Sequence, residues 1–273
     1  MQSLSEIRLL LEARGLAPRK ALGQNFLIDH NLIRKLVDAA QVTASDTILE
    51  VGPGTGTLTE ELLARGSRVI AAELDTSLAA LLRERFAPMG DRFTLIEGDC
   101  LAGKRALAPA IVTALAGQPF KLVANLPYGA ATPVMSTILT DYPQCPGLYV
   151  TIQREVADRL LAQPGTKEFG TLTVIANAAA TGRLVATLPP ECFWPRPDVT
   201  SAMLSLTRRP QPLFHDLRAL ADFTQKLFEK RRKQLGAILG RDREWPPGVA
   251  PSDRAESLTV PQLIELYQSS RGP

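Results

Sequence analysis

Short apolar runs alternate with longer amphipathic stretches through the first two thirds of the chain. The short runs have the length and composition of buried strands, and the longer stretches repeat their apolar positions at helical spacing. This alternation predicts an α/β fold, in which helices cover both faces of a mostly parallel sheet. The expected strands are Thr47–Val51, Arg68–Glu73, Phe93–Glu97, Lys121–Asn125 and Gly147–Gln153, and the helices between them include Thr57–Arg65, Ser77–Phe86 and Pro133–Tyr142.

Further elements flank this alternating region. Before it, the pattern predicts one helix over Leu4–Arg14 and another that begins after Asp29, because a helix-capping residue precedes each. After it, three segments can add strands: Thr171–Asn177, Arg183–Leu188 and Ala202–Thr207. Their connections are short, which favours antiparallel strands at the edge of the sheet.

The character of the chain changes near residue 208. Two arginines and two prolines within Arg208–Pro212 indicate a linker, and the segments beyond it, Leu213–Leu239 and Val260–Gln268, look helical. We therefore expect two domains. Residues 1–208 form a Rossmann-like domain with an N-terminal helical extension, and residues 209–273 form a small helical domain.

The composition excludes several classes of protein. The 273 residues carry a net charge of +3 with a pI near 8.8, which by itself says little about nucleic acid. Three widely spaced cysteines and two histidines fit neither a disulfide framework nor a metal site, so we expect no metal and a reducing, cytoplasmic location. No apolar run is long enough to span a bilayer, and nothing indicates more than a monomer.

A glycine-rich turn follows the first expected strand. The segment Gly52-Pro53-Gly54-Thr55-Gly56 lets the backbone take positive φ and lets a ligand approach closely. A dinucleotide fingerprint would need a further glycine where the chain has Thr57. A tight turn without a ligand is therefore an equal alternative for this segment taken alone.

Two acidic residues at the ends of the next two strands change that balance. Glu73 ends the second strand, where a carboxylate accepts hydrogen bonds from ribose hydroxyls, and Asp99 follows the third, where a carboxylate can accept one from an adenine amine. Each acid alone is more simply a solvated loop residue. Together with the glycine turn they indicate an adenosine without a diphosphate, and hence S-adenosylmethionine.

The segment Asn125-Leu126-Pro127-Tyr128 follows the fourth expected strand and suits a planar base with an exocyclic amine. The amide oxygen of Asn125 and a backbone carbonyl at Leu126 or Pro127 can accept hydrogen bonds from the amine, while Tyr128 stacks on the base. The plainer alternative is an asparagine that ends a strand in a turn. The Pro-Tyr pair that follows makes this alternative the weaker one.

A second aromatic segment spans Phe193–Ser201 and is stiffened by two prolines. Such a loop can present Phe193 to the other face of the base. An equal alternative, which the residues alone leave open, places Phe193 and Trp194 in the core.

Taken together, these segments resemble the small-subunit (16S) ribosomal RNA adenine N6,N6-dimethyltransferases, the KsgA-type family. The resemblance runs through nearly the whole chain, in order: Leu22–Leu27, Glu50–Thr59, Glu73 with Asp75, Gly98-Asp99, Asn125–Tyr128, Gln153–Ala157, Phe193–Ser201 and Lys230–Leu235. It implies a class I S-adenosylmethionine methyltransferase fold. It also implies that two adjacent adenines in the 3′-terminal hairpin loop of small-subunit ribosomal RNA are dimethylated, during assembly of the subunit.

The resemblance assigns roles to matching positions of this chain. It implies a cofactor site formed by Asn25, Leu27, Gly52, Glu73, Asp99 and Asn125, to which the glycine turn adds Gly54. It implies that Asn125 contacts the target amine and that Tyr128 and Phe193 stack on the base. The chain departs from the family pattern at Gly129-Ala130, within Phe169–Asn177 and in the long stretch Lys104–Pro119.

Two other functions use the same core motifs. One is a large-subunit ribosomal RNA adenine methyltransferase of the macrolide-resistance type, and the other is a non-catalytic ribosome-assembly or transcription factor. The long N-terminal segment and the basic tail motif favour the small-subunit enzyme. The presence of Glu73, Asp99, Asn125 and Tyr128 argues against loss of the chemistry.

A basic run lies in the tail. Between Lys226 and Arg243, seven Lys or Arg residues occur against two acidic residues, a local balance of 7 − 2 = +5. The four consecutive cations Lys230–Lys233 would point all around a helix, so not all of them can be simply solvated. We expect RNA phosphate contacts from Arg231, Arg232 and Lys233, mixed with an ion pair between the two domains.

Overall fold

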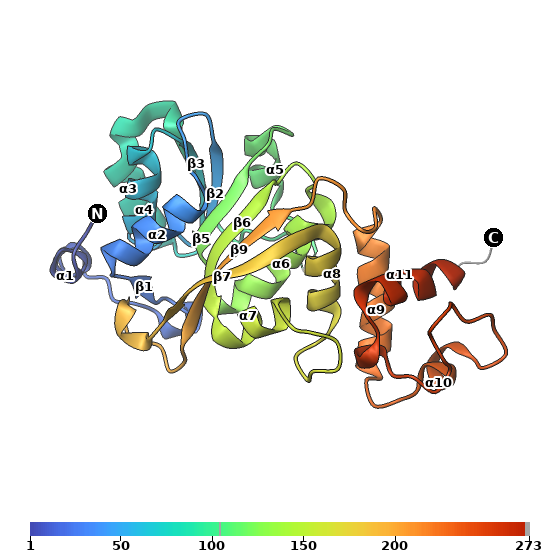
Figure 1. Cartoon of the computed structure of the whole chain (residues 1–273). Helices are drawn as coiled ribbons and strands as arrows, with labels where there is room; N and C mark the ends of the chain where they lie inside the picture. The colour runs from blue at the N-terminus through green and yellow to red at the C-terminus, as the bar shows by residue number, and fades with distance from the viewer. Residues whose placement is uncertain (104, 271–273) are drawn as a thin grey trace.

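A seven-stranded sheet forms the centre of the computed structural model, which describes residues 1–103 and 105–270 (Figure 1). The strand order is β4-β3-β2-β5-β6-β9-β7; the first five strands are parallel, and β9 runs antiparallel to both of its neighbours. The strands are β2 (Thr47–Val51), β3 (Arg68–Glu73), β4 (Phe93–Glu97), β5 (Lys121–Asn125), β6 (Gly147–Gln153), β7 (Ala180–Leu188) and β9 (Ser201–Arg208). The α/β prediction is confirmed, and β2 to β6 have the predicted bounds.

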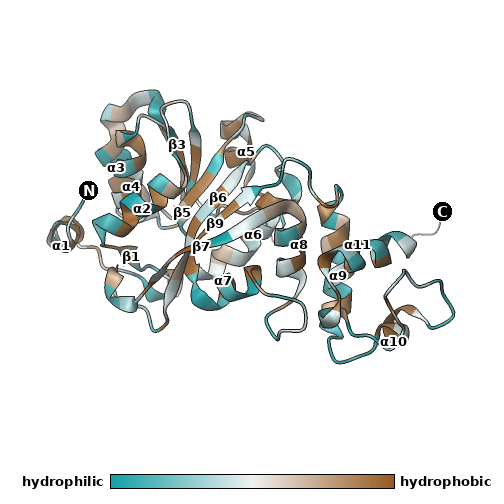
Figure 2. Cartoon of the chain, viewed as in Figure 1, coloured by the Kyte–Doolittle hydropathy of each residue, from teal (hydrophilic) through white to brown (hydrophobic). Residues whose placement is uncertain are grey.

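Helices cover both faces of the sheet because residues along each strand alternate between two apolar clusters. In β2, Ile48 belongs to the cluster under α2, α3 and α4, whereas Leu49 belongs to the cluster under α5 to α8. Figure 2 shows the central strands mostly brown and many of the outer loops teal. The helices are α2 (His30–Ala39), α3 (Thr57–Ala64), α4 (Thr76–Phe86), α5 (Pro109–Leu115), α6 (Tyr128–Asp141), α7 (Arg154–Leu160) and α8 (Thr171–Ala179).

The N-terminal segment lies against the same sheet. Helix α1 (Leu4–Glu12) begins as predicted after Ser3, and the carboxylate of Asp29 accepts hydrogen bonds from the first turn of α2. Between these helices, the short strand β1 (Phe26–Leu27) pairs antiparallel with β8 (Phe193–Trp194). This two-stranded sheet joins segments that lie more than 160 residues apart in the chain.

The prediction of a strand over Thr171–Asn177 is wrong, because these residues lie in helix α8. Their β-branched side chains indicated a strand, but the buried positions Val174, Ile175 and Ala178 follow helical spacing. The N–H of Gly170 donates to the hydroxyl of Thr173 at 3.1 Å, and this hydrogen bond caps the N-terminus of the helix. The other two expected strands are confirmed as parts of β7 and β9, which are antiparallel to each other.

Helix α6 begins five residues before the predicted start at Pro133. Pro133 therefore lies inside the helix as its sixth residue, where the missing N–H removes the hydrogen bond to the carbonyl of Gly129. The earlier start makes Tyr128 the first residue of the helix and leaves no loop between it and the end of β5 except Leu126-Pro127. Within the stretch Lys104–Pro119, Lys104 lies outside the described residues, and α5 occupies the middle.

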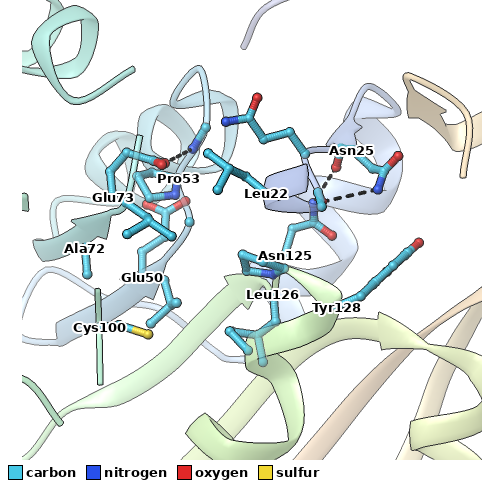
Figure 3. A pocket seen from close by; sticks show the side chains of 18 of the residues that line it. Leu22, Asn25, Glu50, Pro53, Ala72, Glu73, Cys100, Asn125, Leu126 and Tyr128 are labelled. Carbon is cyan, nitrogen blue, oxygen red and sulfur yellow. Dashed lines mark hydrogen bonds between the residues drawn. The ribbon is translucent and has the colours of Figure 1, made fainter. Parts of the chain in front are cut away.

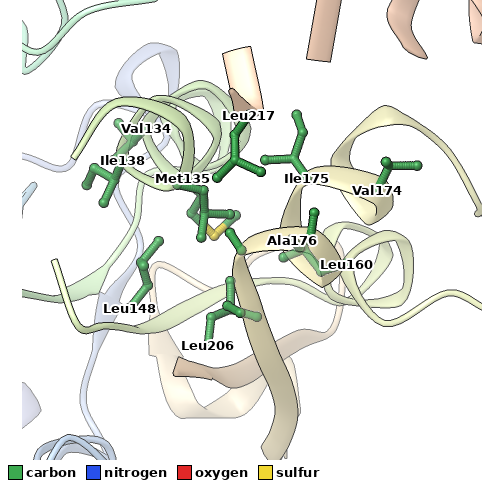
Figure 4. Close-up of a cluster of buried hydrophobic side chains, with 14 of the residues drawn as sticks. Val134, Met135, Ile138, Leu148, Leu160, Val174, Ile175, Ala176, Leu206 and Leu217 are labelled. Carbon is green, nitrogen blue, oxygen red and sulfur yellow. The ribbon is translucent and has the colours of Figure 1, made fainter. Parts of the chain in front are cut away.

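The C-terminal segment forms α9 (Leu217–Glu229), α10 (Leu235–Leu239) and α11 (Val260–Ser269). The prediction of helix through Lys230–Lys233 is wrong: the chain leaves α9 at Lys230, and the N–H of Leu235 donates to Asp253 O at 2.7 Å instead. Figure 4 shows Leu217 of α9 packed with side chains of α6 and α8 in one apolar cluster. One apolar cluster therefore contains residues from both sides of position 208. The division into two domains at this position stays a prediction. No helix in the described part of the chain is long and apolar enough to cross a membrane.

Arg208, the last residue of β9, binds the end of α6. Its guanidinium donates to the carbonyl oxygens of Ile138, Leu139 and Tyr142 at 3.1–3.3 Å, and to Cys145 O at 2.9 Å. A helix end leaves its last carbonyls without intrahelical partners, so one cation satisfies several of them at once.

Replacing this cation should destabilise the protein. We expect Arg208→Met to lower the free energy of unfolding by about 2–3 kcal/mol, because it leaves partly buried carbonyls without donors. Urea unfolding measures the change. Arg183→Met, at an exposed position of β7, is the control and should change stability by less than about 0.5 kcal/mol. Equal effects of the two substitutions would contradict the capping role.

Candidate active site

A cavity of about 520 Å³ opens at the carboxyl ends of the parallel strands (Figure 3). The segments that follow β2, β3, β4 and β5 line one side of it, and the segment from Lys20 to Leu27 lines the other. The strand order reverses here, because β3 and β4 lie on one side of β2 and β5 on the other. Open parallel sheets bind ligands at such switch points.

Contacts within the protein itself require glycines in the turn after β2. Gly52 has φ of 71°, and a Cβ atom there would lie 2.8 Å from the Pro127 ring. At Gly54, with φ of 62°, a Cβ atom would lie 2.8 Å from the Phe26 ring. The glycines therefore allow the loops after β2 and β5 and the strand β1 to touch, a packing reason that the motif alone did not reveal.

Glu73 lies buried at the end of β3, beside the glycine turn. Its carboxylate accepts hydrogen bonds from the N–H of Gly54 at 3.1 Å and from the N–H of Asp75 at 2.9 Å. Burial raises the pKa of this carboxyl, and the two backbone donors oppose that shift. Glu73 lines the cavity, and each carboxylate oxygen has a second lone pair, so the side chain can also accept from a diol.

Glu50 is a second buried acid of the site and one that the sequence reasoning did not single out. Burial, with the nearby Glu73 charge, raises its pKa to about 8, although the Thr59 hydroxyl donates to it at 2.7 Å. Glu50 is thus protonated at neutral pH. Its position inside the apolar run Thr47–Val51 was the sequence feature that could have identified Glu50 as a buried residue of the site.

Asp99 lies at the mouth of the cavity, after β4. One carboxylate oxygen accepts from the N–H of Leu101 at 2.9 Å, which fixes the direction of the side chain. The next residue, Cys100, also lines the cavity, and burial raises the pKa of its thiol to about 12. The thiol is therefore neutral and apolar in character.

The amide of Asn125 is oriented by the opposite side of the cavity. Its Nδ2 donates to the carbonyl oxygen of Asn25 at 2.9 Å, and Asn25 Nδ2 donates to Gly23 O at 3.2 Å (Figure 3). With its N–H₂ bound in this way, the Asn125 amide has its oxygen free to accept a hydrogen bond. Leu27, on β1, is part of the same wall.

Tyr128 and Phe193, the two aromatic residues expected to stack on the base, both line the cavity. Tyr128 is half-buried, and its hydroxyl lies 2.9 Å from the hydroxyl oxygen of Ser201. Phe193 is 3% exposed and belongs to the core cluster, so it is at once a core residue and part of the cavity wall. Trp194 faces away, against Phe26 and under the guanidinium of Arg8.

The basic residues of the tail lie elsewhere. None of Arg231, Arg232 and Lys233 lines the cavity, and all three lie in the turn between α9 and α10. Arg231 forms an ion pair with Glu256, within the tail, and donates to Thr166 O at 2.8 Å, across the predicted domain boundary. Arg231 therefore links the two parts through a hydrogen bond to backbone. The described ion pairs across the predicted boundary lie outside the basic run and join Arg218 to Asp141 and Arg105 to Asp222. Arg232 and Lys233 are exposed.

The lining residues fit S-adenosylmethionine better than a dinucleotide. Glu73 and Asp99 offer acceptors for a ribose diol and an adenine amine, and the apolar side chains of Leu74, Leu101 and Phe26 offer surface for a ring. Among the described lining residues only Lys20 is cationic, which leaves little to neutralise a diphosphate. No group of three or more His, Cys, Asp or Glu side chains in residues 1–103 and 105–270 is arranged to hold a metal ion.

The fold and this cavity define a class I S-adenosylmethionine methyltransferase. The family model for ribosomal RNA adenine dimethylase matches residues 15–270, and the chain belongs to that family. It is 39% identical to a protein from Streptomyces griseus and 41% identical to one from Opitutus terrae, both named ribosomal RNA small subunit methyltransferase A. The matches cover 97% and 96% of this chain, and 93% and 95% of those proteins.

Two solved structures share the fold. A dimethyladenosine transferase from Plasmodium falciparum has a TM-score of 0.71 at 21% identity, covering 89% of this chain and 97% of that one. The 23S rRNA methyltransferase ErmE has a TM-score of 0.66 at 25% identity, covering 90% of this chain and all of that one. The likeness to the Plasmodium enzyme concerns the fold alone.

The raised pKa of Glu50 predicts a dependence of stability on pH. Folded Glu50 holds its proton up to about pH 8, whereas the unfolded side chain loses it near its ordinary pKa of 4.5. The folded state therefore binds the extra proton, and the free energy of unfolding falls as pH rises from about 4.5 to 8.

Glu50→Gln should remove this dependence. We expect the variant to match the wild type near pH 4.5 and to exceed its stability by up to about 3 kcal/mol at pH 7. Urea unfolding of both proteins at several pH values from 5 to 8 measures the difference. A constant difference across that range would show that Glu50 does not titrate there.

Proposed function

We propose that this protein transfers methyl groups from S-adenosylmethionine to N6 of two adjacent adenines in the 3′-terminal hairpin loop of small-subunit ribosomal RNA, during assembly of the subunit. Membership of the dimethylase family and the names of the relatives support this substrate. The observation that carries the chemistry is the oriented amide of Asn125, whose oxygen is left to accept from an amine at the edge of the cavity.

The acceptor is what the reaction needs from the protein. The lone pair of an adenine amine is delocalised into the ring, and hydrogen bonds from its N–H groups to fixed acceptors favour a geometry in which it can attack. The Asn125 oxygen and a carbonyl of Leu126 or Pro127 supply such acceptors, while Tyr128 and Phe193 stack on the base and hold it flat. S-adenosylmethionine supplies an electrophilic methyl group when it is bound. Alignment by these side chains then provides most of the rate.

The remaining residues bind the cofactor. In our proposal Glu73 accepts from the ribose hydroxyls, Asp99 accepts from the adenine amine, and Gly52 and Gly54 allow the turn to approach. Asn25 and Leu27 close the cavity from the side of β1. Adenines in a hairpin loop are unpaired, so moving one into the cavity costs less than opening a duplex.

The proposal also covers the binding partner, the cellular location and the oligomeric state of the enzyme. Its partner is the precursor of the small ribosomal subunit, it acts as a cytoplasmic monomer, and residues 209–273 serve in docking to RNA. The alternative is a large-subunit enzyme of the macrolide-resistance type, which the structural likeness to ErmE supports. The names of the relatives favour the small subunit.

Nucleoside mass spectrometry tests the reaction and the substrate together. Incubation with S-adenosylmethionine should give N6,N6-dimethyladenosine with undermethylated small subunits, and none with large subunits. Asn125→Ala should lower the rate at least about a hundredfold, because the amine loses its fixed acceptor. Asn177→Ala, which replaces another partly buried amide on α8, is the matched control and should retain activity.

Other outcomes separate the alternatives. Product from large-subunit RNA would favour the resistance-type enzyme. Cofactor binding without any product would favour a non-catalytic assembly factor. A variant Asn125→Ala with full activity would remove the proposed role of the amide.

We expect the cations of the tail to have two different roles, RNA binding for Arg232 and Lys233 and stabilisation of the fold for Arg231. Arg232→Ala with Lys233→Ala should weaken binding to small subunits and reduce the slope of log K against log salt by about 1.5, because two phosphate contacts are lost. Arg231→Ala should instead lower the free energy of unfolding by about 1–2 kcal/mol, since its carbonyl partners lose their donor. Binding measured over a range of salt concentrations, with urea unfolding alongside, distinguishes the two effects.

The control for binding is Arg83→Ala, another exposed arginine, on α4 at the opposite end of the molecule (Figure 1). It should change neither the affinity nor the salt dependence. An equal loss of slope in the control and in the double variant would mean that the tail has no special part in docking.

A further inference from the structure

The two aromatic walls of the cavity are connected by one short loop. Phe193, one wall, is the first residue of β8, and the chain then runs through Pro195 and Pro197 to Ser201, the first residue of β9. The hydroxyl of Ser201 lies 2.9 Å from the hydroxyl of Tyr128, the other wall. The loop therefore begins at one aromatic wall and ends in a hydrogen bond to the other.

The sheet fixes the position of Ser201. It pairs with Gln153 of β6 and with Leu188 of β7, and it is fully buried. The N–H of Arg154 donates to the carbonyl of Thr200 at 3.0 Å, just before it. Neighbouring strands on both sides and this hydrogen bond thus hold the backbone of Ser201 in place.

Tyr128 has less support of its own. It is the first residue of α6, it is followed by Gly129, and it is only half-buried because its ring lines the cavity. Burial raises the pKa of its hydroxyl, so the group stays protonated and can bond with Ser201 over the working range of pH. Among the described residues, the Ser201 hydroxyl is the hydrogen-bond partner of the Tyr128 side chain.

We propose that Ser201 is a positioning residue for methyl transfer, which fixes the Tyr128 ring at the spacing from Phe193 that a purine needs. The proposal rests on the proposed stacking roles of Tyr128 and Phe193. A ring anchored at its hydroxyl cannot swing about its side-chain bonds, so the base is presented at one distance and one angle. Small errors in such alignment lower a transfer rate without preventing binding.

The test is a double-substitution cycle on the transfer rate. Ser201→Ala and Tyr128→Phe each remove the hydrogen bond and leave the ring in place, and each should lower the single-turnover rate on undermethylated small subunits about tenfold. The double variant should be no slower than either single variant, because both substitutions remove the same contact. Affinity for S-adenosylmethionine, measured by calorimetry, and affinity for the subunit should stay within about twofold of the wild type.

Ser205→Ala is the matched control. Ser205 is a buried serine on the same strand and the same face of the sheet, four residues further from the cavity, and its loss should leave the rate unchanged. If Ser201→Ala does not fold, Tyr128→Phe alone decides, since it breaks the same bond from the other side. The proposal is overturned by a wild-type rate in Tyr128→Phe, by a roughly hundredfold loss in the double variant, or by a parallel loss of cofactor affinity.

One further variant separates this inference from the proposed function. Tyr128→Ala removes the ring itself and should lower the rate far more than Tyr128→Phe. A wild-type rate in Tyr128→Ala would overturn the stacking role and the positioning role together. A large loss in Tyr128→Ala with no effect of Ser201→Ala would overturn the positioning role alone.

Discussion

The site depends on the pairing of β2 with β5. These strands are neighbours in the sheet, although β3 and β4 separate them in the chain, and the crossing places the glycine turn after β2 against the loop after β5. Gly52 lacks a side chain where the Pro127 ring needs the space, so the two loops meet without a gap. In our proposal the cofactor and the base therefore share one cavity, because the residues proposed to bind each of them lie at adjacent strand ends.

Charge within this cavity is balanced in two different ways. Glu73 is buried but receives two backbone N–H donors, which favour its charged form against the effect of burial. Glu50 has one hydroxyl donor and lies near the Glu73 charge, and its pKa of about 8 means that it holds a proton at neutral pH. The two acids at adjacent strand ends therefore differ in environment: two backbone donors oppose the effect of burial at Glu73, whereas Glu50 holds a proton, which limits the repulsion between them.

Much of this was predictable from local pattern. The five parallel strands could be predicted to the residue because each is a buried run between a turn and a polar strand end. The helix over Thr171–Asn177 could not, since its β-branched residues favour a strand until neighbouring helices fix which positions are buried. The orientation of Asn125 depends on a carbonyl 100 residues earlier in the chain, and the two roles of Phe193 depend on a strand pair that no local pattern indicates. The basic run looked helical because composition does not reveal that Leu235 bonds to Asp253 rather than continuing α9.

Helix α6 is fastened at both ends by the same strand. Ser201, the first residue of β9, binds the first residue of the helix, and Arg208, the last residue of β9, binds its final carbonyls. Fourteen helical residues span about 20 Å, and eight strand residues span about 25 Å, so the two elements have matched lengths. An insertion or deletion in either element would release one of the two ends. To keep both contacts, helix and strand must change length together. The matched lengths of α6 and β9 therefore determine where Tyr128, the aromatic residue at the start of the helix, lies in the cavity.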